Sequence, residues 1–105
     1  MSEGKGNYLL RVIQSKDYKM VNICDEEVCG TRLEEGGLEI HISEDFYSGE
    51  RIGENELLNL LKSAQIINLT GNRCVQFAVN NGFAHKDAVK KVKSVSFLMI
   101  FKFLR

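Results

Sequence analysis

Residues 54–81 read ENELLNLLKSAQIINLTGNRCVQFAVNN, and their periodicity decides the fold class. Apolar side chains in residues 54–64 recur at helical spacing and form one stripe: Leu57, Leu58, Leu61 and Ala64. Acidic residues open this segment and Lys62 lies near its end, as the helix dipole favours. The pattern predicts an amphipathic helix over residues 54–64.

A second helix is predicted over residues 72–81. Asn72 follows Gly71 and is the candidate N-cap, and the inward positions are Val75, Ala78 and Val79. Between the two helices, residues 65–70 (QIINLT) fit either a short buried strand or an extended connection.

Two strands are predicted before these helices, over residues 8–15 (YLLRVIQS) and 19–24 (KMVNIC), and the short turn between them indicates a hairpin. Asp25 follows, as the candidate cap of a short helical turn that Gly30 ends.

A third strand is predicted over residues 38–43 (LEIHIS), which alternate strictly between apolar and polar side chains. The alternation directs Leu38, Ile40 and Ile42 toward the core, and Glu39 and His41 toward solvent.

The end of the chain predicts a short third helix over residues 85–92 and a last strand over residues 95–103 (VSFLMIFKF). The near-continuous apolarity of this strand favours a central or doubly covered position in a sheet.

Strands come first, then helices, then a closing strand, an order typical of α+β proteins. We expect residues 7–105 to form a single small domain, with a mixed or antiparallel sheet of about four strands and two to three helices on one face. Residues 1–6 are predicted to be a flexible leader. One shared core is predicted to contain Leu38, Ile40, Ile42, Leu57, Leu61, Val75, Val79, Phe97 and Phe101.

Charges are sorted along the chain. Residues 1–60 hold 6 Lys/Arg against 13 Asp/Glu, a net of −7, whereas residues 61–105 hold 8 Lys/Arg against the single acid Asp87, a net of +7. Such sorting indicates a charged partner such as nucleic acid, unless the two halves neutralise each other in the fold. No segment has the apolar region of a signal peptide or approaches the roughly 18 apolar residues of a membrane span, so we expect a cytoplasmic protein without membrane contact.

The three cysteines, an odd number, indicate a reducing compartment. Cys24 and Cys29 are separated by four residues, and with Cys74 and the histidines, His41 and His85, they could supply zinc ligands. Buried unpaired thiols fit the pattern better, because cysteine is among the most buried residue types. We therefore expect no metal and no cofactor.

No catalytic residue is predicted. Cys74 lies near the start of a helix, which favours a thiolate, but no histidine is paired with it locally and burial would raise its pKa. The sequence therefore leans away from an enzyme, and a small hydrolase or transferase is the least favoured class.

The strongest candidate binding surface is basic. Lys86, Lys90 and Lys93 fall at helical spacing, with Lys91 beside them, and lysine clusters bind phosphate backbones without reading sequence. Arg73, after Gly71, is a candidate anion contact at a helix start, and Tyr47 is a candidate for base stacking. A solvated helix face explains the same lysines, and the sequence pI near 6.7 is below that of a dedicated nucleic-acid binder.

The chain also resembles a known family. The resemblance rests on Cys24-Asp25-Glu26-Glu27 followed by Gly30, on residues 43–49 (SEDFYSG) and on residues 68–71 (NLTG). These elements are similar to an archaeal family of uncharacterised conserved proteins, domain of unknown function 424. The resemblance implies an archaeal source and RNA as a partner, because members are regarded as candidate RNA-binding proteins without an established activity.

One departure from the family pattern bears on catalysis. Similar proteins often carry a Gly-x-Pro-His-Ala-Gln element near the end of the chain, whereas residues 94–99 here read SVSFLM. We therefore expect a non-catalytic protein of an archaeal cytosol that binds RNA or a ribonucleoprotein. The alternative is a protein–protein adaptor whose acidic half docks a basic partner through Glu26, Glu27, Glu34 and Glu35. The oligomeric state is left open.

Overall fold

The computed structural model describes residues 8–43 and 50–102. The predicted leader, Tyr47 and the end of the predicted last strand lie outside the described residues. In chain order the elements are β1 (Tyr8–Gln14), β2 (Lys19–Asp25), the 3-10 turn η1 (Glu26–Val28), β3 (Arg32–Glu35), β4 (Leu38–His41), β5 (Glu50–Ile52), α2 (Glu54–Ser63), β6 (Ile66–Thr70), α3 (Asn72–Asn80), the 3-10 turn η2 (Lys86–Ala88), β7 (Lys90–Val92) and β8 (Val95–Phe101).

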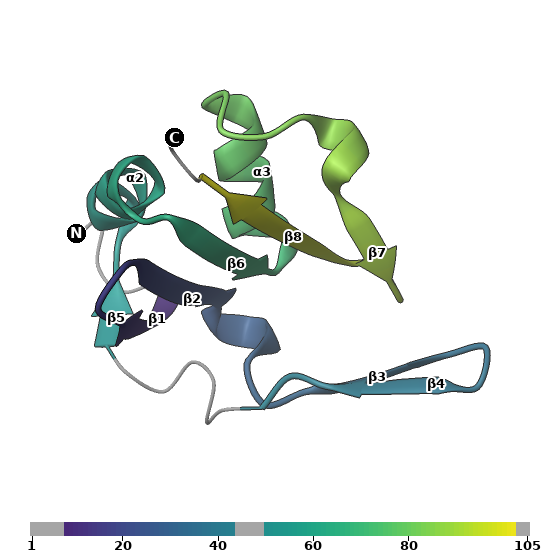
Figure 1. Cartoon of the computed structure of the whole chain (residues 1–105). Coiled ribbons are helices and arrows are strands. Elements are labelled where there is room, and N and C mark those ends of the chain that lie inside the picture. Colours follow the sequence, from purple (N-terminus) through teal and green to yellow (C-terminus); the bar gives the residue numbers. More distant parts are fainter. Residues whose placement is uncertain (1–7, 44–49, 103–105) are drawn as a thin grey trace, which may run out of the picture.

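A six-stranded mixed sheet with the order β5-β1-β2-β6-β8-β7 forms the centre of the fold. Strands β2 and β6 pair in parallel, and the other neighbours pair antiparallel. The helices α2 and α3 lie on one side of this sheet, and the separate hairpin β3–β4 extends on the other side (Figure 1). The α+β class is confirmed, but the sheet is larger than predicted because β5 and β7, three residues each, were not recognised as strands.

Both central helices and the strand between them agree with the sequence. Leu57 and Leu61 of α2 are buried, as is Ala64 at its C-cap. Residues 66–70 form the strand β6, one of the two alternatives for the connection between the helices. The predicted hairpin of the first two strands is also present, as β1 and β2. No helix among the described residues is long and apolar enough to cross a membrane.

The main core lies between the helices and the sheet. Val21, Ile23, Ile67 and Leu69 from the two parallel strands are at most 1% exposed and pack against the helices. A second, smaller cluster lies around Ile42 and Cys24 and includes half-buried side chains of the hairpin β3–β4 and of β8. The prediction of one shared core is therefore wrong, because the described core residues form two clusters.

Two predicted core residues are in solvent. Leu38 is 55% exposed because β4 belongs to the projecting hairpin rather than to the main sheet. Phe101 is 57% exposed because it points to the face of the sheet that the helices leave uncovered. Three others, Ile40, Val79 and Phe97, are half-buried. The strand predicted over residues 38–43 is present as the shorter β4 (Leu38–His41), with Glu39 and His41 exposed as predicted.

The predicted third helix is wrong. Residues 86–88 form only the short turn η2, and residues 90–92 form β7, which pairs with β8. Lys93 and Ser94 between them have φ angles of 50° and 64°, as in the two-residue turns that match the twist of a hairpin. Local lysine spacing favoured a helix, but pairing with the apolar strand β8 decides the structure.

The last strand is internal, between β6 and β7, as its apolarity predicted. It is not covered on both faces, however. Ser96, Leu98 and Ile100 are buried, whereas Met99 is 53% exposed on the uncovered face. That face is therefore partly apolar and open.

Two leucines that the sequence assigned to the same core test this arrangement. We expect Leu61→Ala to lower the free energy of unfolding by about 2–5 kcal/mol, because it leaves a cavity in the main core. Leu38→Ala should change it by less than about 0.5 kcal/mol, because the side chain is already in solvent. Urea denaturation followed by circular dichroism measures both, and similar losses in the two variants would contradict the position of the hairpin.

Candidate functional site

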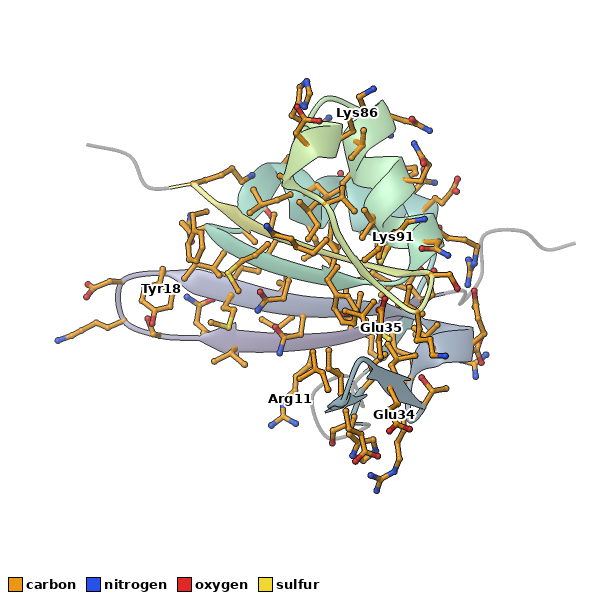
Figure 2. All side chains as sticks on the ribbon, turned by 90° about the vertical axis from the view of Figure 1, so that its right-hand side faces the viewer. Arg11, Tyr18, Glu34, Glu35, Lys86 and Lys91 are labelled. Atoms are coloured by element: carbon orange, nitrogen blue, oxygen red, sulfur yellow. The ribbon has the colours of Figure 1, made fainter. Side chains whose placement is uncertain are left out.

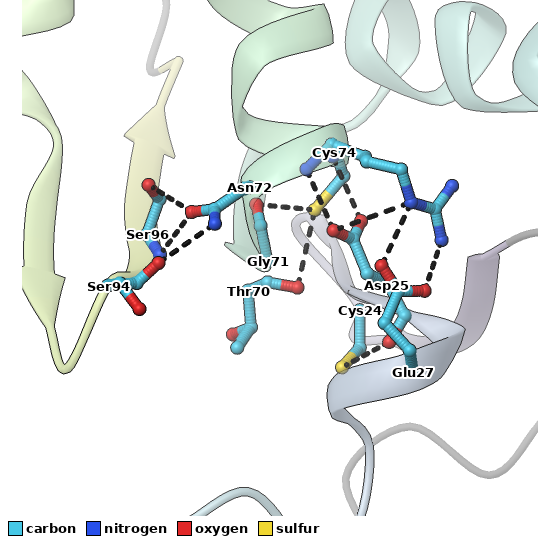
Figure 3. A network of polar contacts seen from close by, with 10 residues as sticks. Cys24, Asp25, Glu27, Thr70, Gly71, Asn72, Cys74, Ser94 and Ser96 are labelled. Atoms are coloured by element: carbon cyan, nitrogen blue, oxygen red, sulfur yellow. Dashed lines mark hydrogen bonds and ion pairs between the residues drawn. The ribbon is translucent and has the colours of Figure 1, made fainter. Parts of the chain in front are cut away.

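The carboxylate of Asp25, at the end of β2, caps the N-terminus of α3 (Figure 3). Its Oδ2 accepts a hydrogen bond from the backbone N–H of Arg73 (2.7 Å), and its Oδ1 accepts one from that of Cys74 (2.9 Å). Because Asp25 is 1% exposed, these bonds satisfy helix donors in a place that water does not reach. Burial raises the pKa of the Asp25 carboxyl, and the two N–H donors and Arg73 oppose that rise.

The sequence-based N-cap predictions are only partly confirmed. Asp25 holds the predicted N-cap position of η1, but its side chain makes no bond to that turn. The N-cap position of α3 is Gly71 rather than Asn72, so that prediction is wrong. Asn72 instead connects α3 to the start of β8. Its Nδ2 donates to the carbonyl oxygen of Ser94 (2.8 Å), and its Oδ1 accepts from the backbone N–H (2.9 Å) and the hydroxyl (2.7 Å) of Ser96.

The contact between Asp25 and the start of α3 also requires a glycine at position 71. Its φ of 126° is a conformation that L side chains rarely adopt. A Cβ at this position would lie 2.4 Å from Cγ of Asp25, much closer than van der Waals contact allows. The glycine therefore lets β6 turn into α3 directly beside the capping carboxylate.

Arg73 is the cation of this cluster. Its Nε donates to Oε2 of Glu27 (3.0 Å) and its Nη2 to Oε1, its Nε lies 4.0 Å from Oδ2 of Asp25, and its guanidinium lies 5.1 Å from the ring centre of Tyr8. The hydrogen bond from Arg73 lowers the pKa of Glu27. The position where the sequence predicted an anion contact is therefore filled by carboxylates of the chain itself.

A cleft of about 520 Å³ lies on the uncovered face of the sheet. Asn22 and Asn68 line it from the two central strands, and Nδ2 of Asn68 donates a hydrogen bond to Oδ1 of Asn22 (2.8 Å). The other polar and apolar side chains come from the surrounding strands and include His41, Phe97, Met99 and Lys90. None of the described residues that line the cleft is acidic.

The predicted lysines do not share one helical face, because β7 replaces the helix. Lys90 pairs with Phe97 and lines the cleft, whereas Lys91 pairs with Ser96 and lies on the opposite face of the strand. Lys86 and Lys91 line a second pocket, of about 250 Å³, beside α3 (Figure 2).

Lys93 lies in the turn between β7 and β8. Its backbone N–H donates to Oε1 of Glu35 (2.9 Å), so this turn is bonded to the hairpin β3–β4. The structure thus brings Lys86 and Lys91 together, separates them from Lys90, and leaves Arg73 in its own cluster.

The sequence analysis identified Lys90 of the cleft but missed its two asparagines. Asn22 and Asn68 interrupt otherwise apolar strands, and that interruption was the available signal. Their pairing depends on the parallel neighbours β2 and β6, which lie far apart in the sequence. His41 was placed on the solvent side correctly, but its position beside the cleft follows only from the path of the hairpin.

The thiols of Cys24 and Cys74 are buried and unpaired, as predicted. Burial raises the pKa of both thiols, so neither is activated as a nucleophile. Within residues 8–43 and 50–102, no group of three or more His, Cys, Asp or Glu side chains could hold a metal ion.

Comparisons with known proteins agree with this fold. Residues 13–103 match the family described as Protein of unknown function (DUF424). An uncharacterized conserved protein from Methanopyrus kandleri has a similar crystal structure, with a TM-score of 0.77 and 24% sequence identity over 93% of each chain. At this identity the likeness concerns the fold alone. No curated protein matches the chain.

Two glycines with left-handed backbones test the Asp25 contact. We expect Gly71→Ala to lower the free energy of unfolding by about 3 kcal/mol or more, since backbone strain and a clash with the capping carboxylate add. Gly82→Ala is the matched control. Gly82 has a φ of 81° and open space around it, so only backbone strain of about 1 kcal/mol applies. Urea denaturation measures both, and equal losses would show that the close approach is unimportant.

Proposed function

The chain belongs to the DUF424 family of proteins of unknown function, and we propose that it is a non-catalytic protein that binds single-stranded RNA on the uncovered face of its sheet. The observation that carries the proposal is the cleft on that face. Its volume of about 520 Å³ is within the range of small-ligand sites and suits one base with its sugar.

Aromatic rings on an open sheet support this proposal. Phe97 and Phe101 lie on the same face of β8, one in the wall of the cleft and the other 57% exposed. Proteins that bind single-stranded nucleic acid commonly stack bases on such rings. Met99 lies between them on the same face and extends the apolar surface.

The amide pair supplies polar groups to a bound base. The hydrogen bond between Asn68 and Asn22 uses one N–H of Asn68 and the oxygen of Asn22. The described hydrogen bonds do not use the Nδ2 donors of Asn22 or Oδ1 of Asn68. Asn22 is only 5% exposed, so a base reaches this pair only from within the cleft that both residues line. RNA-binding proteins read single-stranded bases through such edges.

Charge on this face favours a polyanion. Lys90 and His41 line the cleft without a carboxylate among the described lining residues. A basic protein partner would meet the ammonium group of Lys90 here.

The acidic residues that an adaptor would use are largely engaged within the chain. Glu26 forms an ion pair with Arg51, Glu27 with Arg73, and Glu35 accepts a hydrogen bond from the backbone of Lys93. These contacts reduce the charge available to a basic partner, and for this reason RNA is the preferred ligand. The adaptor alternative is an outcome of the test below.

Binding of a fluorescently labelled single-stranded oligoribonucleotide tests the proposal. We expect Phe97→Leu/Lys90→Ala to weaken binding at least about tenfold, because stacking on one ring contributes about 1–3 kcal/mol per base. Lys16→Ala, in the exposed turn between β1 and β2, is the control and should bind as the wild type does. Fluorescence anisotropy at two salt concentrations measures the affinities.

Two results would contradict RNA binding at the cleft. One is equal affinity of the double variant and the wild type. The other is absence of RNA binding together with amide shifts in residues 25–36 on adding a basic peptide, which would support the adaptor instead.

A further inference from the structure

We infer that the pocket beside α3, lined by Lys86 and Lys91, binds a phosphate group of the RNA. The RNA chain then passes from the cleft around β7, at the edge of the sheet, to this pocket. The inference rests on the proposed function, since the RNA in the cleft is the source of the phosphate. It assigns a second contact region on the opposite face of the sheet.

The pocket brings together two cations from different elements. Lys86 comes from η2 and Lys91 from β7, and both line a volume of about 250 Å³ next to α3. Asn72, Gln76 and Ser96 contribute polar groups, and no carboxylate is among the described residues that line it. Figure 2 shows both lysines on the side of the sheet that α3 covers.

These lysines differ from three of the arginines. Arg32, Arg51 and Arg73 each form an ion pair with a glutamate. Among the described residues, Lys86 and Lys91 form no ion pair. Two ammonium groups directed to one pocket without a counter-charge form an anion site.

The nearest acid in the sequence does not fill this role. Asp87 follows Lys86, but its side chain is 83% exposed and its Oδ2 lies 3.4 Å from Nδ1 of His85. It is not among the residues that line the pocket.

The donors available in the pocket indicate the kind of ligand. The amide of Asn72 donates to Ser94, the hydroxyl of Ser96 donates to Asn72, and the amide of Gln76 donates to Asn80. Each amide keeps a second N–H, but the two ammonium groups are the charged donors among the described residues of the pocket, and they bind charge without reading a base. A phosphate fits these groups better than a base does.

The alternation of β7 links the pocket to the cleft. Lys90 and Lys91 are neighbours on a three-residue strand and point to opposite faces. Because β7 is the edge strand of the sheet, a bound RNA chain can pass around it from one face to the other. Successive phosphates can then contact Lys90 on one face and Lys91 with Lys86 on the other.

The first test is the salt dependence of oligoribonucleotide binding. For single strands the slope of log K against log salt is about −0.7 per neutralised phosphate, so loss of the one phosphate contact in Lys86→Ala/Lys91→Ala should make the slope shallower by about 0.7. The matched control Lys16→Ala/Lys62→Ala, with both lysines exposed elsewhere, should leave the slope unchanged. An unchanged slope in the pocket variant overturns the inference.

The second test is titration with inorganic phosphate, followed by NMR. We expect the amides of Gln76, Lys86 and Lys91 to shift in the wild type and not in Lys86→Ala/Lys91→Ala. If both tests fail while Phe97→Leu/Lys90→Ala still weakens RNA binding, phosphate binding in the pocket is overturned and the proposed function is retained. Phosphate shifts without any RNA binding would retain an anion pocket, and would overturn both the proposed function and RNA as the source of the phosphate.

Discussion

The hydrogen bonds from the start of α3 to the buried carboxylate of Asp25 position one whole end of this fold. A helix N-terminus leaves backbone donors without intrahelical partners, and burying them without acceptors is costly. Here the acceptor comes from β2, a strand that precedes α3 by almost half the chain. This contact holds α3 across the parallel pair β2–β6, and thus directs Val75 and Ala78 into the main core. The Arg73–Glu27 pair and the bonds from Asn72 to β8 complete the same end of the sheet.

The two faces of the sheet have different compositions because only one is covered by helices. Val21, Ile23, Ile67 and Leu69, the central residues of β2 and β6 that face the helices, are aliphatic. Asn22 and Asn68 face the other way. Polar side chains in central strands are costly unless they are hydrogen-bonded, and these two bond to each other. Both asparagines line the cleft together with Phe97 and Lys90. Ile40 and His41 of the hairpin β3–β4 line it from the other side.

Much of the fold follows from local patterns in the sequence. The stripe of leucines predicts α2, and the spacing of Val75 and Ala78 predicts α3, because in both cases burial and helical periodicity agree. Leu38 and Lys90 show where local patterns are insufficient. The alternation around Leu38 identifies a strand but cannot tell whether that strand joins the main sheet. Lys90 has neighbours at helical spacing, yet hairpin pairing with Phe97 makes it part of a strand. The cleft depends on the parallel pairing of β2 with β6, and one sequence contains no direct signal for that pairing. The carboxylate that caps α3 was missed for the same reason.

The short edge strands of the sheet also affect how copies of the protein meet at high concentration. β8 carries the run VSFLMIF, with high β-propensity and no charge, which is the composition of a segment that stacks into intermolecular sheets. β7 covers the open side of this strand with three residues, of which two are lysines. At the other end of the sheet, β5 is equally short and carries Glu50 and Arg51. Charged, short edges discourage pairing with a second molecule. Loss of the lysine charges on β7 would therefore bring the protein closer to amyloid-like aggregation even where its folded stability is unchanged.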